Sequence, residues 1–412
     1  KDGTVTNSER RISRVRPAVR APGQARHDWA IAADIAQRLA HHLTPGDAAL
    51  RERRRAMFDY PTPESIWNEH RESTRGRDLD ITGLSYGLID SSGPQQWPMR
   101  EGEHKGRARL YEDGVFATSD GRARFADPTP RALAEPRNAA FPFSLNTGRL
   151  RDQWHGMSRT GTLGRLYGHV SEPAVEVHPQ DLARLRAQPG DFLRLRSRRG
   201  EVVLPAQSST AVAPAQAYVP MHWGPEVLAA SEGGINELTT PAYCPQSKQP
   251  ELKHAAVAIE RIDLPWRLVA RAWLPPAHVL SVRQALVQAM KDARRENTPL
   301  AALRVASVLP FGEEDERGSR QGDAATPVGV VLNAAAAAPI ELPALRPLLS
   351  LMGLDGAAVL AYDDPRRAQQ RRLKLSPDGQ ALAGYWLAGD AQGHEALDSL
   401  LVERSALPCA AR

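Results

Sequence analysis

The chain has 412 residues, of which 42% are hydrophobic, so it can form two or three domains with cores of their own. Its two cysteines, Cys244 and Cys409, exclude a disulfide framework and any four-cysteine metal or iron–sulfur site within the chain, and they suit a reducing compartment. The net charge of +5 is not gathered into basic runs interleaved with aromatic residues, which argues against nucleic acid as a partner. The longest apolar runs, such as 334–340, are far too short to span a membrane.

The first third of the chain contains two predicted helices and a long irregular stretch. Apolar residues at helical spacing, among them Ile31 and Ile35, predict a helix from about residue 28 to residue 39. A shorter helix is predicted over residues 64–72, directly after a proline-rich break. Residues 92–138 are rich in Gly, Pro, Arg and Asp, which predicts an extended loop region.

The middle of the chain changes to short apolar runs separated by turn residues. A helix is predicted from residue 179 to residue 187, because Pro179 suits a first helical turn. Many short strands with one helix between them indicate a compact β-barrel. Six strands are predicted, over residues 141–145, 174–177, 192–196, 202–206, 217–221 and 255–259.

The last third of the chain predicts a mixed α and β structure. Residues 279–295 have the pattern of an amphipathic helix. The sequence Ser-Pro-Asp-Gly at 376–379 is typical of a hairpin turn between two strands. Four strands are predicted, over residues 328–332, 357–362, 370–375 and 382–388.

Residues 141–160, FPFSLNTGRLRDQWHGMSRT, are the most informative segment for function. An apolar strand is followed at once by amides, hydroxyls and guanidinium groups. Backbone N–H groups after Gly148, the hydroxyl of Thr147 and the guanidinium of Arg149 could cradle a pyrophosphate. Carboxylate and amide side chains such as Asp152 and Asn236 could read the edges of a guanine base.

Several other polar residues have a plainer interpretation. Taken alone, Trp154 suits a core position and His155 an ordinary hydrogen-bonded position. Four further histidines lack metal-ligand spacing and are interpreted as structural or surface residues: His169, His178, His222 and His254. Cys244 is predicted to be a small buried residue and not a metal ligand.

Three blocks of sequence, in this order, resemble molybdopterin-guanine-dinucleotide oxidoreductases, nearest to bacterial assimilatory nitrate reductase catalytic subunits. The first is GTVTNSERR at 3–11, and the second is NEHRESTRGRDLDITGLSY at 68–86 with GPQQWP at 93–98. The third is 146–160 together with GINELTTPAYCPQSKQPELK at 234–253. The resemblance covers roughly residues 1–262, and in this context Trp154 and His155 are interpreted as cofactor contacts.

The resemblance implies an α/β plus β-barrel fold class with three domains. Residues 1–138 would end an α/β molybdopterin oxidoreductase domain, and residues 139–264 would form a double-psi β-barrel that binds the dinucleotide. Separately, AYDDPRR at 361–367 with residues 372–375 and 382–390 resembles the small C-terminal domain of pyridine-nucleotide reductases, which implies a small α+β domain over residues 265–412. The implied cofactor is molybdenum bis(molybdopterin guanine dinucleotide), and a [4Fe-4S] cluster is expected only in an N-terminal part outside this chain.

The resemblance also implies a set of cofactor-binding residues, with no catalytic and no metal-ligating residue in this chain. These are Asn7, Asn146, Thr147, Gly148, Arg149, Asp152, Gln153, Trp154, His155, Ser158, Arg159, Thr160, Asn236, Leu238, Thr239 and Lys253.

The implied function is that of a fragment of a cytoplasmic molybdenum enzyme that reduces nitrate to nitrite in nitrate assimilation. Its expected electron donor is a ferredoxin, a flavodoxin or an NADH-dependent reductase subunit, and the fragment is expected to be inactive alone. Two alternatives stay open at this point: a formate dehydrogenase of the same superfamily, and a molybdopterin-binding module without turnover.

Overall fold

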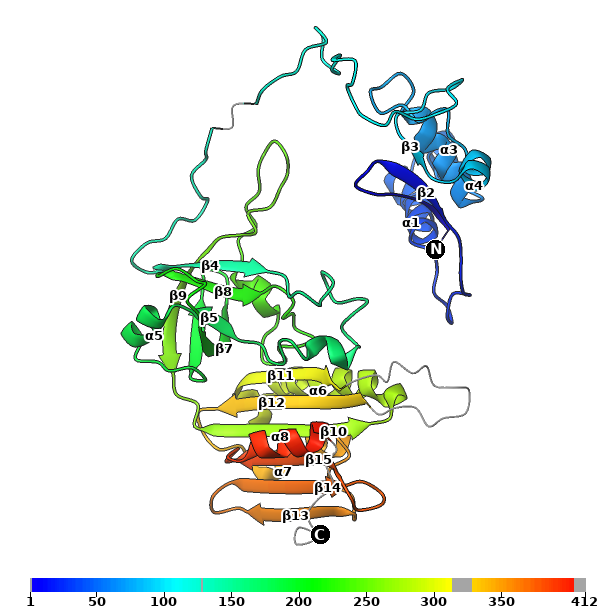
Figure 1. Ribbon diagram of the computed structural model, residues 1–412. Helices are drawn as coiled ribbons and strands as arrows, with labels where there is room; N and C mark the ends of the chain where they lie inside the picture. The colour runs from blue at the N-terminus through cyan, green and yellow to red at the C-terminus, as the bar shows by residue number, and fades with distance from the viewer. Residues whose placement is uncertain (1, 127–128, 313–327, 404–412) are drawn as a thin grey trace. The chain divides into compact units, whose positions relative to one another are not determined.

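The computed structural model describes residues 2–126, 129–312 and 328–403 of the chain, which folds into two compact units, Lys1–Pro130 and Arg131–Arg412 (Figure 1). The first unit holds a three-stranded sheet of order β1-β2-β3 and four helices. Their bounds are β1 Gly3–Thr6, β2 Arg11–Val15, α1 Asp28–Leu43, α2 Ala48–Ala56, α3 Pro63–Ser73, α4 Tyr86–Ser92 and β3 Gln95–Gln96.

Both helices predicted in the first unit are present. α3 begins where Thr62 and Ser65 form a reciprocal capping box and Pro63 occupies the first turn. α1 also forms, but the apolar stripe that predicted it faces outward: Ile31 and Ile35 are 41% and 53% exposed. Periodicity therefore predicted the helix correctly and did not predict what the helix packs against.

The second unit begins with a closed barrel of six strands in the order β4-β8-β5-β7-β6-β9. β4 runs parallel to β8 and β5 parallel to β7, whereas the remaining pairs of neighbours are antiparallel. This confirms the predicted barrel. The bounds are β4 Phe143–Gly148, η1 Gly164–Tyr167, β5 Val175–Val177, α5 Pro179–Arg184, β6 Phe192–Arg196, β7 Glu201–Ser208, β8 Gln216–Pro220, η2 Gly234–Leu238 and β9 Ala255–Ile262.

A six-stranded antiparallel sheet of order β11-β12-β10-β15-β14-β13 follows the barrel in the same unit. The predicted turn at 376–379 connects β14 to β15, with Ser376 N donating to the carbonyl of Ala381. The bounds are β10 Trp266–Leu274, α6 Pro276–Glu296, η3 Pro299–Ala302, β11 Leu303–Phe311, β12 Val328–Ala336, α7 Leu342–Leu351, β13 Val359–Asp364, β14 Gln369–Leu375, β15 Leu382–Gly389 and α8 His394–Glu403.

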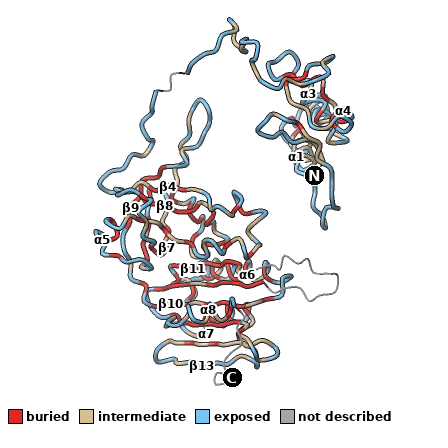
Figure 2. The backbone as a smooth tube through the Cα atoms, viewed as in Figure 1, coloured by how far each residue is buried: buried red, intermediate tan, exposed pale blue. Residues whose placement is uncertain are grey.

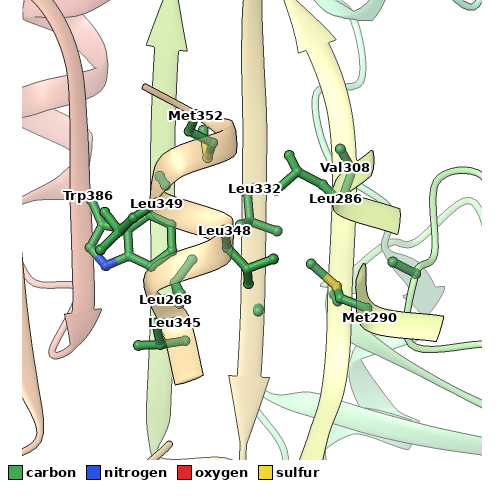
Figure 3. Close-up of a cluster of buried hydrophobic side chains, with 14 of the residues drawn as sticks. Leu268, Leu286, Met290, Val308, Leu332, Leu345, Leu348, Leu349, Met352 and Trp386 are labelled. Atoms are coloured by element: carbon green, nitrogen blue, oxygen red, sulfur yellow. The ribbon is translucent and has the colours of Figure 1, made fainter. Parts of the chain in front are cut away.

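Side chains that alternate along β10 build two apolar layers on this sheet. Leu268 and its even-numbered neighbours pack under α6 and α7, in one cluster with Leu286 of α6 and Leu348 of α7 (Figure 3). Val269 and its odd-numbered neighbours pack on the side of α8. Each such fully buried side chain stabilises the fold by about 1.5–3 kcal/mol, and buried positions run along the barrel and the central strands (Figure 2).

The barrel and the C-terminal sheet join through backbone hydrogen bonds. Val308 N donates to the carbonyl of Val227 over 3.0 Å, and Ala229 N donates to the carbonyl of Ala306 over 2.8 Å. Leu309 of β11 is buried in the core of the barrel. The domain boundaries expected at 138 and 264 stay a prediction, since the structure gathers the barrel and the sheet into one unit.

Candidate functional site

The candidate site is built at the edge of the barrel where the parallel strands β4 and β8 both end. Along β4, Leu145 and Thr147 point inward and are buried, whereas Asn146 is exposed. Thr147 is held by the turn that leads into β9, because its Oγ1 donates to the carbonyl of Leu252 over 3.2 Å. Lys253 Nζ in turn donates to the carbonyl of Thr147 over 2.6 Å. Two predicted site residues from distant parts of the sequence therefore meet here.

Gly148 lies where the chain leaves β4, and a larger residue there would require the Tyr218 side chain to move. A Cβ atom on Gly148 would lie 2.7 Å from the hydroxyl oxygen of Tyr218, on the neighbouring strand β8. The next residue, Arg149, is exposed, and no carboxylate oxygen lies within 4 Å of its guanidinium among the described residues. The end of β4 therefore presents a cation without a partner beside a closely packed turn.

The segment after Arg149 is shaped by its own side chains. Gln153 is 3% exposed, and its amide oxygen accepts a hydrogen bond from Thr160 Oγ1 over 2.7 Å. Asp152 is paired with its neighbour Arg151 over 2.9 Å, an ion pair that lowers the pKa of Asp152. Three of the predicted cofactor residues thus have hydrogen-bonding partners within this segment.

Between these anchors, an aromatic and a basic side chain project from the surface. Trp154 is 46% exposed, and its ring meets the ring of His155 edge-on at 4.6 Å. The guanidinium carbon of Arg159 lies 5.7 Å from the centre of the Trp154 ring. Ser158 is exposed on the same stretch. An exposed aromatic face with a cation beside it suits a planar base and its phosphate.

His222, which the sequence interpretation took as a structural or surface residue, is buried beside the segment that follows β4. It is 2% exposed, and its Nδ1–H donates to the carbonyl oxygen of His155 over 2.6 Å. Its Nε2 is buried without a hydrogen-bond partner among the described residues. Burial lowers the pKa of His222, so its ring is neutral with an unused acceptor. Since β4 and β8 are parallel, their ends lie at one edge, and knowledge of that pairing would have pointed to His222.

The second predicted segment, on η2, attaches to the loop that carries His222. Ile235 N donates to the carbonyl of Trp223 over 3.0 Å. Gly234 has a φ of +62°, and a Cβ atom there would lie 2.4 Å from that same carbonyl oxygen. Only glycine can make this close approach. The loop at 222–224 therefore links the two predicted segments, through the His222 side chain on one side and backbone contacts with η2 on the other.

The remaining predicted residues fall outside this cluster or have other roles. Asn236 is exposed on η2, and no hydrogen bond joins it to the end of β4 among the described residues. Thr239 Oγ1 donates to the carbonyl of Asn236 over 3.1 Å, and Leu238 is fully buried in the barrel core. Asn7 lies in the first unit, where its side-chain oxygen accepts hydrogen bonds from the backbone of Glu9 and Arg11 in the turn between β1 and β2.

One further expectation is wrong. Cys244 is partly exposed and not buried, because it lies in the loop between η2 and β9, where its backbone N–H donates to the carbonyl of Gln249 over 2.8 Å. Hydrogen bonds from Ser247 lower the pKa of Cys244 to about 7. Cys409 lies outside the described residues.

Within the described ranges no group of three or more His, Cys, Asp or Glu side chains could hold a metal ion. No helix in those ranges has the length and apolar character needed to cross a membrane.

Comparison with known protein families identifies the class of this fold and site. Residues 143–256 match the molydopterin dinucleotide binding domain, and residues 1–38 match the molybdopterin oxidoreductase family. The first match covers the barrel from the start of β4 into β9, including the edge that carries Arg149 and His222. The chain therefore contains a molydopterin dinucleotide-binding domain together with a segment of a molybdopterin oxidoreductase domain.

The relatives that the chain matches include two nitrate reductases and a formate dehydrogenase subunit. The chain is 38% identical over 272 residues to a nitrate reductase of Klebsiella oxytoca and 37% identical over 264 residues to one of Synechocystis; each match covers 63% of this chain. It is 33% identical over 262 residues to the alpha subunit of an F420-dependent formate dehydrogenase of Methanocaldococcus jannaschii, covering 64% of this chain. The chain spans 28%, 35% and 35% of the lengths of these three relatives, so it corresponds to about a third of each. The predicted resemblance is confirmed.

The residues at this edge fit a molybdopterin dinucleotide. Arg149 has no carboxylate within 4 Å among the described residues, and His222 keeps a buried acceptor without a donor. Exposed hydroxyl and aromatic groups, Ser158 and Trp154, lie on the same segment. These unpaired charged and polar groups are thus available to bind a phosphate and a base. The cofactor predicted from the sequence agrees with the matched domain.

Proposed function

We propose that this chain is the cofactor-clamping part of a molybdenum enzyme that reduces nitrate to nitrite. The observation that carries the proposal is the set of unpartnered polar groups at the β4 and β8 edge, within a domain that matches molydopterin dinucleotide binding. The two nitrate reductases among the relatives support nitrate as the substrate. Each nitrate would lose one oxygen atom and take up two electrons and two protons, giving nitrite and water.

Residues of this chain would hold the molybdenum bis(molybdopterin guanine dinucleotide) and shield it from water. Arg149 and Arg159 would bind phosphate oxygens, the Trp154 ring would stack on a base, and His222 Nε2 would accept a hydrogen bond. The bound molybdenum would supply the oxygen-atom transfer chemistry. Asn146, Ser158 and Lys253 would complete the polar wall, as the sequence resemblance implies.

The wider setting belongs to the same proposal. The enzyme would act in the cytoplasm in nitrate assimilation and would receive electrons from a ferredoxin, a flavodoxin or an NADH-dependent reductase subunit. A [4Fe-4S] cluster would lie in a part of the enzyme outside this chain. The domain boundaries at 138 and 264 are proposed with it.

Formate oxidation is the second candidate, because a formate dehydrogenase subunit is 33% identical over a similar share of the chain. Assays of the purified full-length enzyme would separate the two candidates. With a reduced viologen as electron donor, nitrate should be consumed and nitrite formed, whereas formate with an oxidised dye should give no turnover. The reverse result would replace nitrate by formate as the substrate.

Cofactor clamping is tested in the full-length enzyme by Arg149→Ala, alone and combined with His155→Ala. Loss of a charged hydrogen bond to phosphate costs about 1.5–3 kcal/mol, or roughly a 10- to 150-fold loss of affinity, so molybdenum per protein should fall. The matched control is Arg151→Ala, which removes an exposed guanidinium that is already paired with Asp152. Full molybdenum occupancy and unchanged turnover in both Arg149 variants would contradict the proposal.

A further inference from the structure

The C-terminal sheet has a helix, α6, that contacts the segment proposed to bind the cofactor. The contact is made by Arg283, which is 7% exposed although it carries a charge. Its Nη1 donates a hydrogen bond to the carbonyl oxygen of Gly161 over 2.8 Å. A side chain from a part of the chain that neither family match includes thus bonds to the backbone next to Ser158, Arg159 and Thr160.

A second buried group bonds to the same carbonyl. Tyr167 of η1 is 2% exposed, and its hydroxyl lies 3.2 Å from the carbonyl oxygen of Gly161 and 3.4 Å from the sulfur of Met157. The guanidinium of Arg283 also acts electrostatically on Tyr167, and burial raises the pKa of Tyr167. The two side chains therefore hold one end of the turn that runs from Met157 to Gly161.

The turn itself is conformationally demanding. Gly161 N donates to the carbonyl of Met157 over 2.8 Å, and a Cβ atom on Gly161 would lie 2.7 Å from that oxygen. Met157 has a φ of +56°, in the left-handed region that non-glycine residues rarely adopt. Such a backbone persists only where its surroundings hold it in place. Arg283 and Tyr167 provide that support.

The charge of Arg283 has no close counterpart. No carboxylate oxygen lies within 4 Å of its guanidinium in the part of the chain that the structure describes, and its Nε has no hydrogen-bond partner there. Glu226 acts on it only at longer range, and burial lowers the pKa of Arg283. A buried cation that is incompletely paired lowers the stability of a fold, and groups of this kind cluster at functional sites.

An open pocket borders the contact between Arg283 and Gly161. It has a volume of about 450 Å³ and is lined by Ser158, Thr162 and Glu226 and, from α6, by Arg283 and Lys291. Two cations face one carboxylate in this pocket, so its potential favours an anion. The turn that Arg283 holds therefore places Ser158 at the wall of a basic pocket.

We propose that Arg283 of α6, the helix packed on the C-terminal sheet, is a positioning residue for the cofactor-binding segment, acting through the Gly161 carbonyl on the turn from Met157 to Gly161. The C-terminal sheet thereby has a function of its own: it sets the geometry in which the hydroxyl and guanidinium groups at 158–160 meet an anionic ligand. The purpose inferred for Arg283 rests on the proposed cofactor-clamping function, whereas its contact with the Gly161 carbonyl does not depend on that function.

Hydrogen exchange measured by mass spectrometry on this chain without cofactor tests the geometry. In Arg283→Met, amides in peptides covering 154–162 should exchange about tenfold faster or more, the effect of losing one hydrogen bond to a charged group. Peptides from β6 and β7 should not change. Arg283→Lys should restore part of the protection, because an ammonium group can still bond to the Gly161 carbonyl. The matched control is Arg295→Met on the same helix, at an exposed guanidinium.

The same variants in the full-length enzyme test the purpose. Molybdenum and guanine nucleotide per protein should fall in Arg283→Met, recover partly in Arg283→Lys and stay at the wild-type value in Arg295→Met. If Arg283→Met does not fold, Tyr167→Phe carries the same test, since it removes one of the two groups on the Gly161 carbonyl. Unchanged exchange at 154–162, or an equal rise across the whole barrel, would overturn the positioning role. A wild-type enzyme without molybdenum would instead refute the proposed function and leave the exchange result standing.

Discussion

Arg149, where the barrel strands β4 and β8 end, and Arg271, in the C-terminal sheet, are cations in opposite situations. Arg149 is exposed and has no carboxylate within 4 Å among the described residues. Arg271 is 7% exposed, and its guanidinium lies 3.2 Å from Glu172 of the barrel and 3.3 Å from Asp398 of α8. The first arrangement leaves binding capacity for a ligand, and the second uses it within the fold. Whether a cation has a carboxylate partner thus distinguishes the proposed binding edge from a structural junction in the same unit of the molecule.

The largest effect is expected at the structural junction. Arg271→Ala should lower the free energy of unfolding by about 3 kcal/mol, because it removes a buried guanidinium together with its hydrogen bond to Asn333 and its ion pairs with the partly exposed Glu172 and Asp398. Denaturant titration measures this. Arg149→Ala in the same assay should change stability by no more than about 0.5 kcal/mol. If Arg149→Ala destabilises the chain as much as Arg271→Ala does, the distinction between the two regions is wrong.

Gly148 tests how closely the binding edge is packed. Gly148→Ala should destabilise the chain by about 1–3 kcal/mol, because the new methyl group would overlap the Tyr218 ring. Tyr218→Ala in the same chain should relieve part of that cost, which a double-mutant cycle would measure. Gly156→Ala is the matched control, since nothing lies within 4 Å of a Cβ atom there. Equal costs for the two alanines would argue against the close packing.

His222 gives the binding edge a dependence of stability on pH. Burial lowers the pKa of His222 below its ordinary value of 6.5, so below about pH 6.5 the unfolded chain binds a proton that the folded ring resists. The stabilisation is complete above that pH and is lost as the pH falls toward the folded pKa. His222→Asn keeps a donor for the His155 carbonyl but does not titrate, so its unfolding free energy should fall less steeply on acidification. A variant profile that matches the wild type would assign the pH dependence to other groups.

The smallest effect concerns Cys244, in the loop between η2 and β9. Its pKa of about 7 predicts that alkylation by iodoacetamide, measured in a Cys409→Ser chain, reaches half its maximal rate near pH 7. Ser247→Ala should move that midpoint upward, because a hydrogen bond from Ser247 is the largest cause of the lowered pKa. Reaction with the midpoint of an ordinary thiol in both chains would show that the loop leaves the sulfur unperturbed.

Local patterns determined much of this protein without reference to its tertiary structure. Apolar periodicity predicted α1 and α6, short runs between turn residues predicted the barrel strands, and Ser-Pro-Asp-Gly predicted the turn between β14 and β15. These features depend on neighbours in the sequence, whose spacing and backbone preferences can be read directly. The polar segment after β4 likewise predicted the edge of the barrel at which the cofactor site is proposed.

Contacts between distant residues were decided only by the tertiary structure. The parallel pairing of β4 with β8 brings His222 to the carbonyl of His155, the junction of sheet and barrel buries Arg271, and α6 places Arg283 on the carbonyl of Gly161. The same reason explains why α1 could be predicted while its outward apolar stripe could not. A pattern along one segment defines which face is apolar, but the strand, helix or carbonyl that meets that face is set by the packing of the whole unit.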